Sequence, residues 1–300
     1  MELRDIEYFA VAAEHGNLRR ASEALGLSPP ALSKSLRRLE ESMQATLMER
    51  SANGVTLTPV GSALLAHVHR LRLALRDIRR EASDLGQGRA GHLRVGVGAT
   101  TVEDLPAAWV ALLKQSPRLS GQVVVADNDV LVPQLREGKL DLIFNVLADA
   151  GYAGCVQERL FDDEFIVCAA VAHRLSARKR VTLADLTEEE WVLSAPAVLN
   201  VLHLQRVFRE HGLPPPRMAI EARPIRLRLQ ICAATALLSF NAKRMLRLVA
   251  PRLRLKELPV DELRWRRPVG VIYRQEAYLP PAARRLIELL GAVEARPSGQ

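Results

Sequence analysis

The chain has 300 residues and a formal net charge of +8, and 48% of its residues are hydrophobic. This length predicts two or three folded units rather than one compact core. No stretch of 18 or more apolar residues occurs, and Met1–Asp5 lacks the basic and then apolar pattern of a signal peptide. We therefore expect a cytoplasmic protein that has no membrane association.

The three cysteines do not suggest a crosslink or a metal site. Cys155, Cys168 and Cys232 are far apart and form no CxxC pair, which argues against a zinc ribbon or a disulfide framework. Free cysteines are usually buried, so we expect reduced, buried thiols, with redox sensing as the alternative. We expect no metal and no other cofactor.

Positive charge is concentrated near the N-terminus. Residues 17–38 contain a single acidic side chain, Glu23, among several basic ones: Arg19, Arg20, Lys34, Arg37 and Arg38. Such a cluster is attracted to the phosphate backbone of DNA. Exposed charge is also the ordinary property of a solvated surface.

The first residues predict two short helices. Apolar side chains repeat at helical spacing from Leu3 to Ala13, and Gly16 ends that helix. Asn17 then caps a second helix over about 18–25. A short turn separates it from the next helical segment.

A third helix is predicted from Pro29 to about Ser42, with Ser28 as its N-cap. Pro29 and Pro30 fit its first turn, where backbone N–H groups have no intrahelical partner. One face is apolar, with Leu32, Leu36, Leu39 and Met43, and the other is polar, with Ser33, Lys34, Arg37 and Arg38. Such a helix after a short turn fits the major groove of DNA, and an ordinary amphipathic helix is the alternative.

A short hairpin with Asn53-Gly54 at its turn follows, and the segment from Leu3 to Gly61 resembles the DNA-binding domain of LysR-type regulators. The resemblance is carried by Tyr8-Phe9, Ala21-Ser22, Leu25, Ser28-Pro29-Pro30-Ala31-Leu32-Ser33-Lys34, Leu36, Leu39-Glu40, Leu47, Arg50, Gly54-Val55 and Leu57-Thr58. It implies a winged helix-turn-helix over residues 1–58.

The resemblance also implies which residues contact DNA. They are Arg20, Ser28, Pro29, Pro30, Ser33, Lys34, Arg37, Arg38, Arg50 and Asn53. Pro30, Ser33 and Lys34 would meet base edges, and the arginines would contact phosphates. Two positions depart from the family pattern. Pro29 replaces a common Gln and cannot make a bidentate base contact, and Asn53 stands where the wing often has Arg, which weakens minor-groove contact.

Residues 59–90 predict a linker helix and a hinge. Thr58 caps the helix and Pro59 begins it. Apolar residues then recur at spacings of four and three, as in a coiled coil: Leu64, Val68, Leu71, Leu75 and Ile78. We expect these residues to form the seam of a homodimer and residues 86–91 to form a flexible hinge.

Residues 91–300 alternate predicted strands and helices, which favours a parallel sheet. Strands are expected at 93–98, 122–126, 140–146, 165–169 and 269–273, and helices at 102–114, 130–136, 199–211 and 281–293. Gly138-Lys139-Leu140-Asp141-Leu142 and the closing Arg267-Pro268, Tyr273-Arg274 and Tyr278-Leu279-Pro280 resemble the effector domain of the same family.

That second resemblance implies two α/β lobes like those of a periplasmic binding protein. We place lobe one at about 91–162 and 267–300 and lobe two at about 163–266. The expected fold class is therefore α/β, with an N-terminal α winged helix-turn-helix, a long linker helix and a two-lobed α/β effector domain.

The same resemblance places a small-molecule effector between the lobes, near strand ends and helix N-termini. It gives seven candidate residues: Thr100, Thr101, Asn128, Asp129, Ala197, Val198 and Arg223. Asp129 is either an N-cap or a pocket residue that disfavours carboxylate ligands. Arg223, Arg226 and Arg228 either hold an anion or belong to the solvated surface of a helix.

No catalytic pattern is present. Gly96-Val97-Gly98 follows a strand, but Thr101 takes the third glycine position of the dinucleotide fingerprint. No Walker A, GxSxG or HExxH sequence occurs, and the histidines do not cluster. The sequence therefore predicts no enzyme. The two resemblances imply a sequence-specific regulator that binds double-stranded DNA and an effector, forms dimers and tetramers, and contacts RNA polymerase. A solute-binding protein with an accessory helical domain is the alternative.

Overall fold

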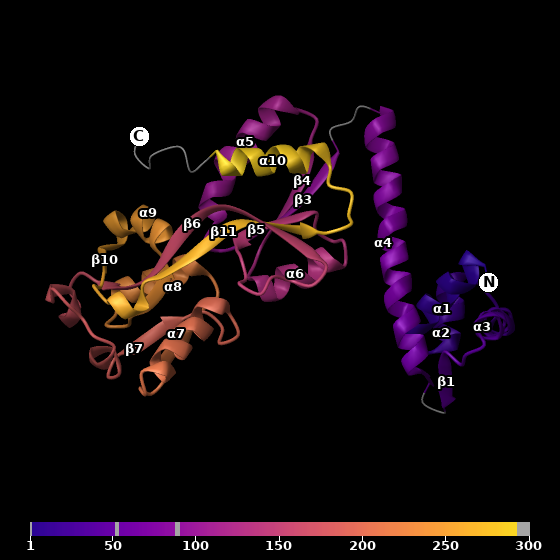
Figure 1. Cartoon of the computed structure of the whole chain (residues 1–300), viewed down its shortest axis with the longest axis horizontal. Helices are drawn as coiled ribbons and strands as arrows, with labels where there is room; N and C mark the ends of the chain where they lie inside the picture. Colours follow the sequence, from indigo (N-terminus) through magenta and orange to yellow (C-terminus); the bar gives the residue numbers. More distant parts are fainter. Residues whose placement is uncertain (1, 52–53, 88–90, 293–300) are drawn as a thin grey trace. The chain divides into compact units, whose positions relative to one another are not determined.

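The computed structural model describes residues 2–51, 54–87 and 91–292, and the chain divides into two compact units, Met1–Ala82 and Ser83–Gln300 (Figure 1). Asn53 lies outside the described residues, as does the side chain of Arg50.

Unit 1 consists of three short helices, a hairpin and a long helix. They are α1 (Leu3–His15), α2 (Leu18–Leu25), α3 (Pro29–Met43), the antiparallel strands β1 (Met48–Ser51) and β2 (Gly54–Leu57), and α4 (Pro59–Gln87), whose last residues belong to unit 2. The predicted caps are present. Asn17 accepts a hydrogen bond from the backbone N–H of Arg19 at 2.9 Å, and Ser28 accepts one from Ala31 at 3.4 Å. They satisfy N–H groups that have no partner within the helix.

One apolar core joins α4 to the helix-turn-helix. Phe9 and Leu32 are fully buried, and Val68 of α4 is 2% exposed in the same cluster. Gly61 allows α4 to approach closely, because a Cβ atom there would lie 2.0 Å from the carbonyl oxygen of Leu47. Met43, predicted for the buried stripe, is exposed at the end of α3.

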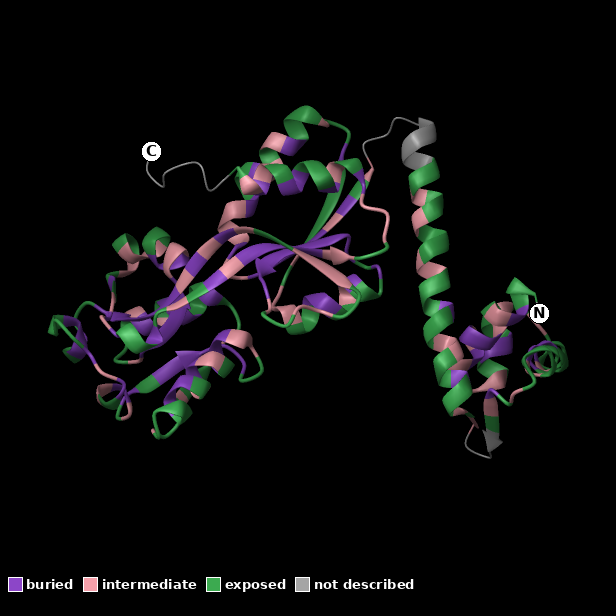
Figure 2. Ribbon diagram, in the orientation of Figure 1, coloured by how far each residue is buried: buried purple, intermediate pink, exposed green. Residues whose placement is uncertain are grey.

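Unit 2 is built on a seven-stranded mixed sheet. In the half that we call lobe one, β3 (His92–Val97) lies between the parallel strands β4 (Ser120–Val125) and β5 (Leu142–Val146). Helices α5 (Leu105–Gln115) and α10 (Pro281–Gly291) pack on one face of this part of the sheet and α6 (Asn128–Arg136) on the other (Figure 1). Figure 2 shows the result: β5 is buried at every position, whereas the edge strand β4 is largely exposed.

Two long strands join lobe one to the other half, lobe two. Strands β6 (Cys155–Ala170) and β11 (Trp265–Arg274) pair antiparallel, and β11 also pairs with β5. Lobe two continues from β6 and contains β7 (Glu190–Leu193), α7 (Leu199–Glu210), β8 (Arg217–Glu221), α8 (Ile225–Ala234), β9 (Ser239–Ala242), α9 (Lys243–Leu253) and β10 (Leu255–Glu257).

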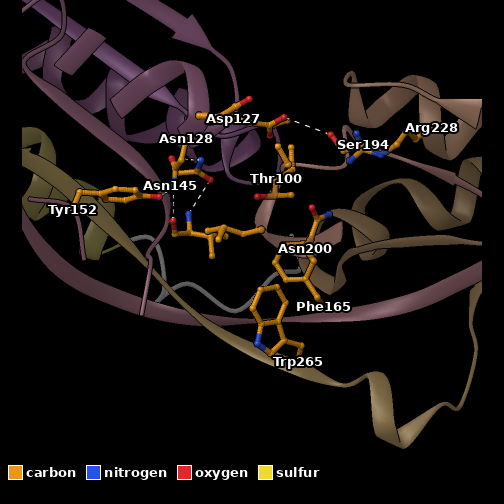
Figure 3. Close-up of a pocket in the computed structure, with 16 residues that line it drawn as sticks. Thr100, Asp127, Asn128, Asn145, Tyr152, Phe165, Ser194, Asn200, Arg228 and Trp265 are labelled. Carbon is orange, nitrogen blue, oxygen red and sulfur yellow. Dashed lines mark hydrogen bonds between the residues drawn. The ribbon is translucent and has the colours of Figure 1, made fainter. Parts of the chain in front are cut away.

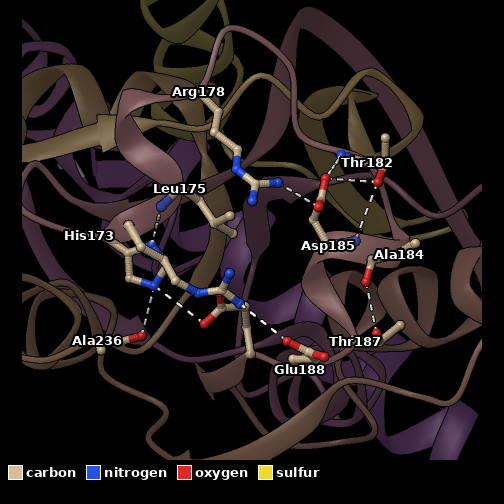
Figure 4. A network of polar contacts seen from close by, with 11 residues as sticks. His173, Leu175, Arg178, Thr182, Ala184, Asp185, Thr187, Glu188 and Ala236 are labelled. Carbon is tan, nitrogen blue, oxygen red and sulfur yellow. Dashed lines mark hydrogen bonds and ion pairs between the residues drawn. The ribbon is translucent and has the colours of Figure 1, made fainter.

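Polar contacts hold the segment between β6 and β7 in place (Figure 4). Asp185 accepts hydrogen bonds from the backbone N–H and the hydroxyl of Thr182, both at 2.9 Å, and from Arg178 at 2.6 Å. These bonds lower the pKa of Asp185 to about 2. Nδ1 of His173 accepts from the backbone N–H of Leu175 at 3.2 Å, so Nε2 carries the proton that faces the carbonyl oxygen of Ala236 at 3.1 Å.

The predicted sheet is partly wrong. The parallel arrangement holds for β3, β4 and β5, but β11, β9 and β10 are antiparallel to their neighbours. The predicted helix at 102–114 is a 3₁₀ turn at Val102–Asp104 followed by α5. Pro106 explains the break, because it lacks an N–H group and fits only the first turn of a helix. The α/β fold class itself is confirmed.

Candidate DNA-binding surface and effector pocket

The outer side of α2 and α3 carries most of the predicted DNA contacts. Arg20, Lys34 and Arg37 are exposed and form no ion pair with any residue in the described part of the chain. Ser28, Pro29 and Pro30 are exposed at the N-terminal end of α3, and Ser33 is half-buried. Cations without internal partners are available to phosphate groups.

Arg38 is also exposed, but it is ion-paired. Its Nε donates to Oδ2 of Asp5 at 2.9 Å, and its Nη2 and the Ser35 hydroxyl donate to Oδ1. Asp5 is fully buried, and the hydrogen bond from Arg38 holds the pKa of that carboxyl below its usual value. Since a buried carboxylate needs a charged partner, Arg38 ties α3 to α1, and its contact with a phosphate stays a prediction.

Only part of the predicted dimer seam is exposed on α4. Leu71 is 38% exposed, Leu75 37% and Ile78 61%. Val68 belongs to the core of its own unit, and Leu64 packs against that core. Val68 is therefore not available as a seam residue, because the helix-turn-helix already covers it.

Unit 2 contains a cavity of about 250 Å³ between the two lobes (Figure 3). Lobe one contributes the residues after β3, the N-terminus of α6 and the end of β5, and lobe two contributes the loop before α7 and part of α8. Strands β6 and β11, which connect the lobes, contribute Phe165 and Trp265. The site thus lies where strands end and helices begin, as is common for ligands of α/β folds.

Most of the predicted effector residues line this cavity: Thr100, Asn128, Asp129, Ala197 and Val198. Arg223 lies beside it and forms an ion pair with Asp129 at 3.2 Å. Thr101 does not reach it. Its side chain is 2% exposed and its hydroxyl donates to the carbonyl oxygen of Phe144 at 3.0 Å, so it fixes the backbone after β3.

Amide side chains line one side of the cavity (Figure 3), and they include Asn145, which was not among the predicted effector residues. Asn145 of β5 donates to Oδ1 of Asn128 at 2.8 Å, and Asn128 donates to the hydroxyl of Tyr152 at 3.1 Å. Gly98 makes room for them, because a Cβ atom there would lie 1.8 Å from Oδ1 of Asn145. Gly98, the glycine after β3, is therefore needed for the packing of these side chains. Asn145 could have been recognised as a candidate in the sequence, because it is a polar residue within the buried strand Leu142–Val146.

Two charged groups face the cavity from opposite lobes, Asp127 before α6 and Arg228 in α8. Burial raises the pKa of Asp127 and lowers the pKa of Arg228 to about 10. Arg228 is 3% exposed and donates to the carbonyl oxygens of Ala222 and Arg223 at 2.8 and 2.6 Å. The interpretation of Arg228 as solvated surface is therefore wrong. The sequence signal that was missed is helical spacing: Arg228 comes three residues after Ile225, which is buried, so both lie on the same face of α8.

Trp265 lies at the junction of the lobes and lines the cavity. The His203 ring stacks on it with centroids 3.9 Å apart, and the Arg267 guanidinium lies 4.6 Å from the ring centroid. Burial lowers the pKa of His203 to about 4. The indole is therefore a natural fluorescent reporter for this site.

A helix-turn-helix unit and a two-lobed α/β unit with an interlobe cavity together define a DNA-binding protein that responds to a ligand. Residues 3–62 match the bacterial regulatory helix-turn-helix protein of the LysR family, and residues 86–295 match the LysR substrate binding domain. The chain belongs to the LysR family of transcription regulators. It is a DNA-binding regulator that takes an effector and self-associates, and the solute-binding alternative is excluded.

Individual relatives agree with this assignment. The chain is 30% identical over 295 residues to the HTH-type transcriptional regulator GbpR of Azospirillum brasilense, covering 97% of this chain and 86% of that protein. It is 29% identical over 194 residues to OxyR of Escherichia coli K12, covering 64% and 63%. The full-length CbnR structure with its target DNA has a TM-score of 0.62 at 23% identity, covering 98% of this chain and 100% of that one, which shows a shared fold.

The described residues contain no helix that is long and apolar enough to span a membrane. They also contain no group of three His, Cys, Asp or Glu side chains placed to hold a metal ion. LysR family members act as transcription regulators, which are not enzymes.

Proposed function

We propose that this regulator recognises DNA through the N-terminal half of α3 and acts in the cytoplasm without enzymatic activity. Pro30, Ser33 and Lys34 contact base edges, and Arg20 and Arg37 contact phosphates. The observation that supports this assignment is the exposed basic surface whose cations have no ion-pair partner among the described residues. Arg50 and Asn53 are the proposed contacts of the wing.

Two copies of the chain pair through the exposed residues of α4, namely Leu71, Leu75 and Ile78. The dimer then presents two recognition helices to dyad-related half-sites, and pairing of the effector domains gives a tetramer. The effector binds in the interlobe cavity. It regulates DNA binding and contact with RNA polymerase only if its affinity differs between two arrangements of the lobes.

The DNA-binding proposal is tested by fluorescence anisotropy on the region upstream of the protein's own gene, with random DNA as competitor, across a salt series. Arg37→Ala weakens binding to all DNA and flattens the log–log salt slope by about one unit, because one phosphate contact is lost. Ser33→Ala changes base preference and leaves the slope unchanged. Arg217→Ala, an exposed arginine of unit 2, is the control. Equal losses on specific and random DNA from both α3 variants would contradict these roles.

The effector proposal is tested with a cavity-filling variant. Ala197 lines the cavity with an exposed side chain, so Ala197→Trp fills the space without disturbing the core. Ala107→Trp, at an exposed position on α5, is the matched control. A metabolite that raises the melting temperature of the wild-type protein and changes Trp265 fluorescence should not stabilise A197W but should stabilise A107W. Equal stabilisation of both variants would place the ligand elsewhere.

A further inference from the structure

Three arginines of lobe two form ion pairs with carboxylates of lobe one. The pairs are Arg223 with Asp129 at 3.2 Å and with Asp127 at 3.6 Å, Arg226 with Glu103, and Arg244 with Asp104 at 2.6 Å. The hydrogen-bonded partners are 94 to 140 residues apart in the chain, so none of these pairs is a local contact within a helix. They join the lobes at more than one point.

The charges have the same arrangement in every pair. All the cations lie at or near α8 and α9 of lobe two, and all the carboxylates lie on the 3₁₀ turn or near the N-terminus of α6 in lobe one. Opposite charges on facing surfaces attract, so each pair favours the arrangement in which the two lobes are close together. The backbone crosses between the lobes in β6 and β11, an arrangement that permits hinge motion.

Arg223 connects these ion pairs to the cavity. Its partners Asp127 and Asp129 both line the cavity, and its own side chain is 47% exposed. Ser194 of lobe two also approaches Asp127, with its hydroxyl 3.5 Å from Oδ2. A ligand that bonds to either carboxylate therefore competes directly with Arg223.

We propose that the arginine–carboxylate pairs form an electrostatic latch that holds the lobes closed before an effector binds, and that Arg223 couples this latch to the cavity. An effector that engages Asp127 and Asp129 displaces Arg223 and releases the lobes. Exposed ion pairs are individually weak and are screened by salt, so the latch opens readily. The coupling to an effector rests on the proposed function of the cavity, whereas the latch itself does not.

The latch is tested by electron–electron distance measurements on the full-length protein. Spin labels are attached at Lys114→Cys in α5 of lobe one and Arg209→Cys in α7 of lobe two, both exposed positions. Cys155→Ser removes the accessible thiol, and Cys168 and Cys232 are buried. Dilution with unlabelled protein leaves one labelled chain per assembly. Circular dichroism confirms that each variant is folded.

Three variants separate the latch from a general charge effect. Arg223→Glu and Arg226→Glu repel the opposite lobe, and Arg226→Glu combined with Glu103→Arg restores that pair with its charges exchanged. Arg217→Glu is the control, because Arg217 pairs with Glu190 within lobe two, at 2.9 Å.

We expect Arg223→Glu and Arg226→Glu to lengthen the mean interlobe distance, the exchanged pair to restore it, and the control to leave it unchanged. Salt at about 1 M, where the Debye length is about 3 Å, should lengthen it in the wild-type protein. An unchanged distance in both single variants, or an equal change in the control, overturns the latch. No effector is used, so failure of the proposed cavity function would show only in the A197W experiment.

Discussion

Asp5 shows how a single buried carboxyl group can orient α3, the helix proposed to recognise DNA. Asp5→Asn removes the charge that accepts the hydrogen bonds of Arg38, and Glu2 at 3.8 Å stays as its carboxylate neighbour. The substitution should lower the free energy of unfolding of unit 1 by about 2 kcal/mol, the usual range for a hydrogen bond to a charged group. Because the pKa of Asp5 is lowered in the folded state, this stabilisation is complete at neutral pH and is lost as the pH falls through the folded pKa. The variant should therefore lose less stability between pH 7 and pH 3 than the wild type.

Urea unfolding followed by far-UV circular dichroism measures this effect, and hydrogen exchange in α1 and α3 locates it. Glu23→Gln is the control, since Glu23 forms an exposed pair with Arg19. A loss of stability in Asp5→Asn no larger than that in the control would show that Arg38 does not hold α3 in place.

The reactivity of each cysteine depends on its burial and on its neighbours. Cys168 and Cys232 are fully buried, and the contact with Cys168, together with burial, raises the pKa of the Cys232 thiol. Because both thiols are buried, and because a thiol such as that of Cys232 is reactive only as the thiolate, Cys168 and Cys232 should resist an alkylating reagent in the folded protein, while half-buried Cys155 reacts. Mass spectrometry after brief alkylation checks this. Modification of Cys168 or Cys232 as fast as Cys155 would favour the redox alternative.

The apolar stripe of helix α4 has a buried part and an exposed part, and the exposed part is the proposed dimer seam. Leu75→Glu and Ile78→Glu place charges on its exposed part and should dissociate the dimer without unfolding unit 1. Val68→Ala should instead leave the assembly intact and lower the stability of unit 1 by about 2 kcal/mol, through lost burial and a cavity. Analytical ultracentrifugation and thermal unfolding distinguish the two outcomes. Dimers that persist in Leu75→Glu/Ile78→Glu would locate the seam elsewhere.

The helices of unit 1 could be predicted because their signals are local. Asn17, Ser28 and the paired prolines define helix starts within a few residues, and Asn53-Gly54 indicates the turn of the hairpin that follows. The burial of Val68 and the pairing of Arg38 with Asp5 could not be predicted, because each depends on a distant element that packs against the side chain. Arg226, Leu227 and Arg228 illustrate the limit, since the alternating charges look alike in the sequence, yet Arg226 is exposed and Arg228 is buried.

At the scale of the molecule, the sequence predicted two lobes and several cavity residues but not the mixed sheet. β6 runs from Cys155 to Ala170, and only its buried end at 165–169 carries a continuous apolar pattern. Its first half contains charged residues such as Glu158 and Arg159, and it is a strand because β11 pairs with it. Pairing between segments so far apart in the chain leaves no local pattern. The ion pairs between the lobes escaped prediction for the same reason.

The dimer proposed for the whole molecule makes a geometric prediction about its DNA. Two recognition helices on a dyad contact half-sites whose centres lie whole helical turns apart, about 10.5 base pairs per turn. Inserting five base pairs between the half-sites rotates one of them to the opposite face of the duplex, so binding should fall towards the level of a single half-site. Anisotropy titrations on the two duplexes measure this loss, and a duplex with one half-site deleted is the reference. Undiminished binding to the five-base-pair insertion would mean that the two helix-turn-helix units are not held in a fixed relation.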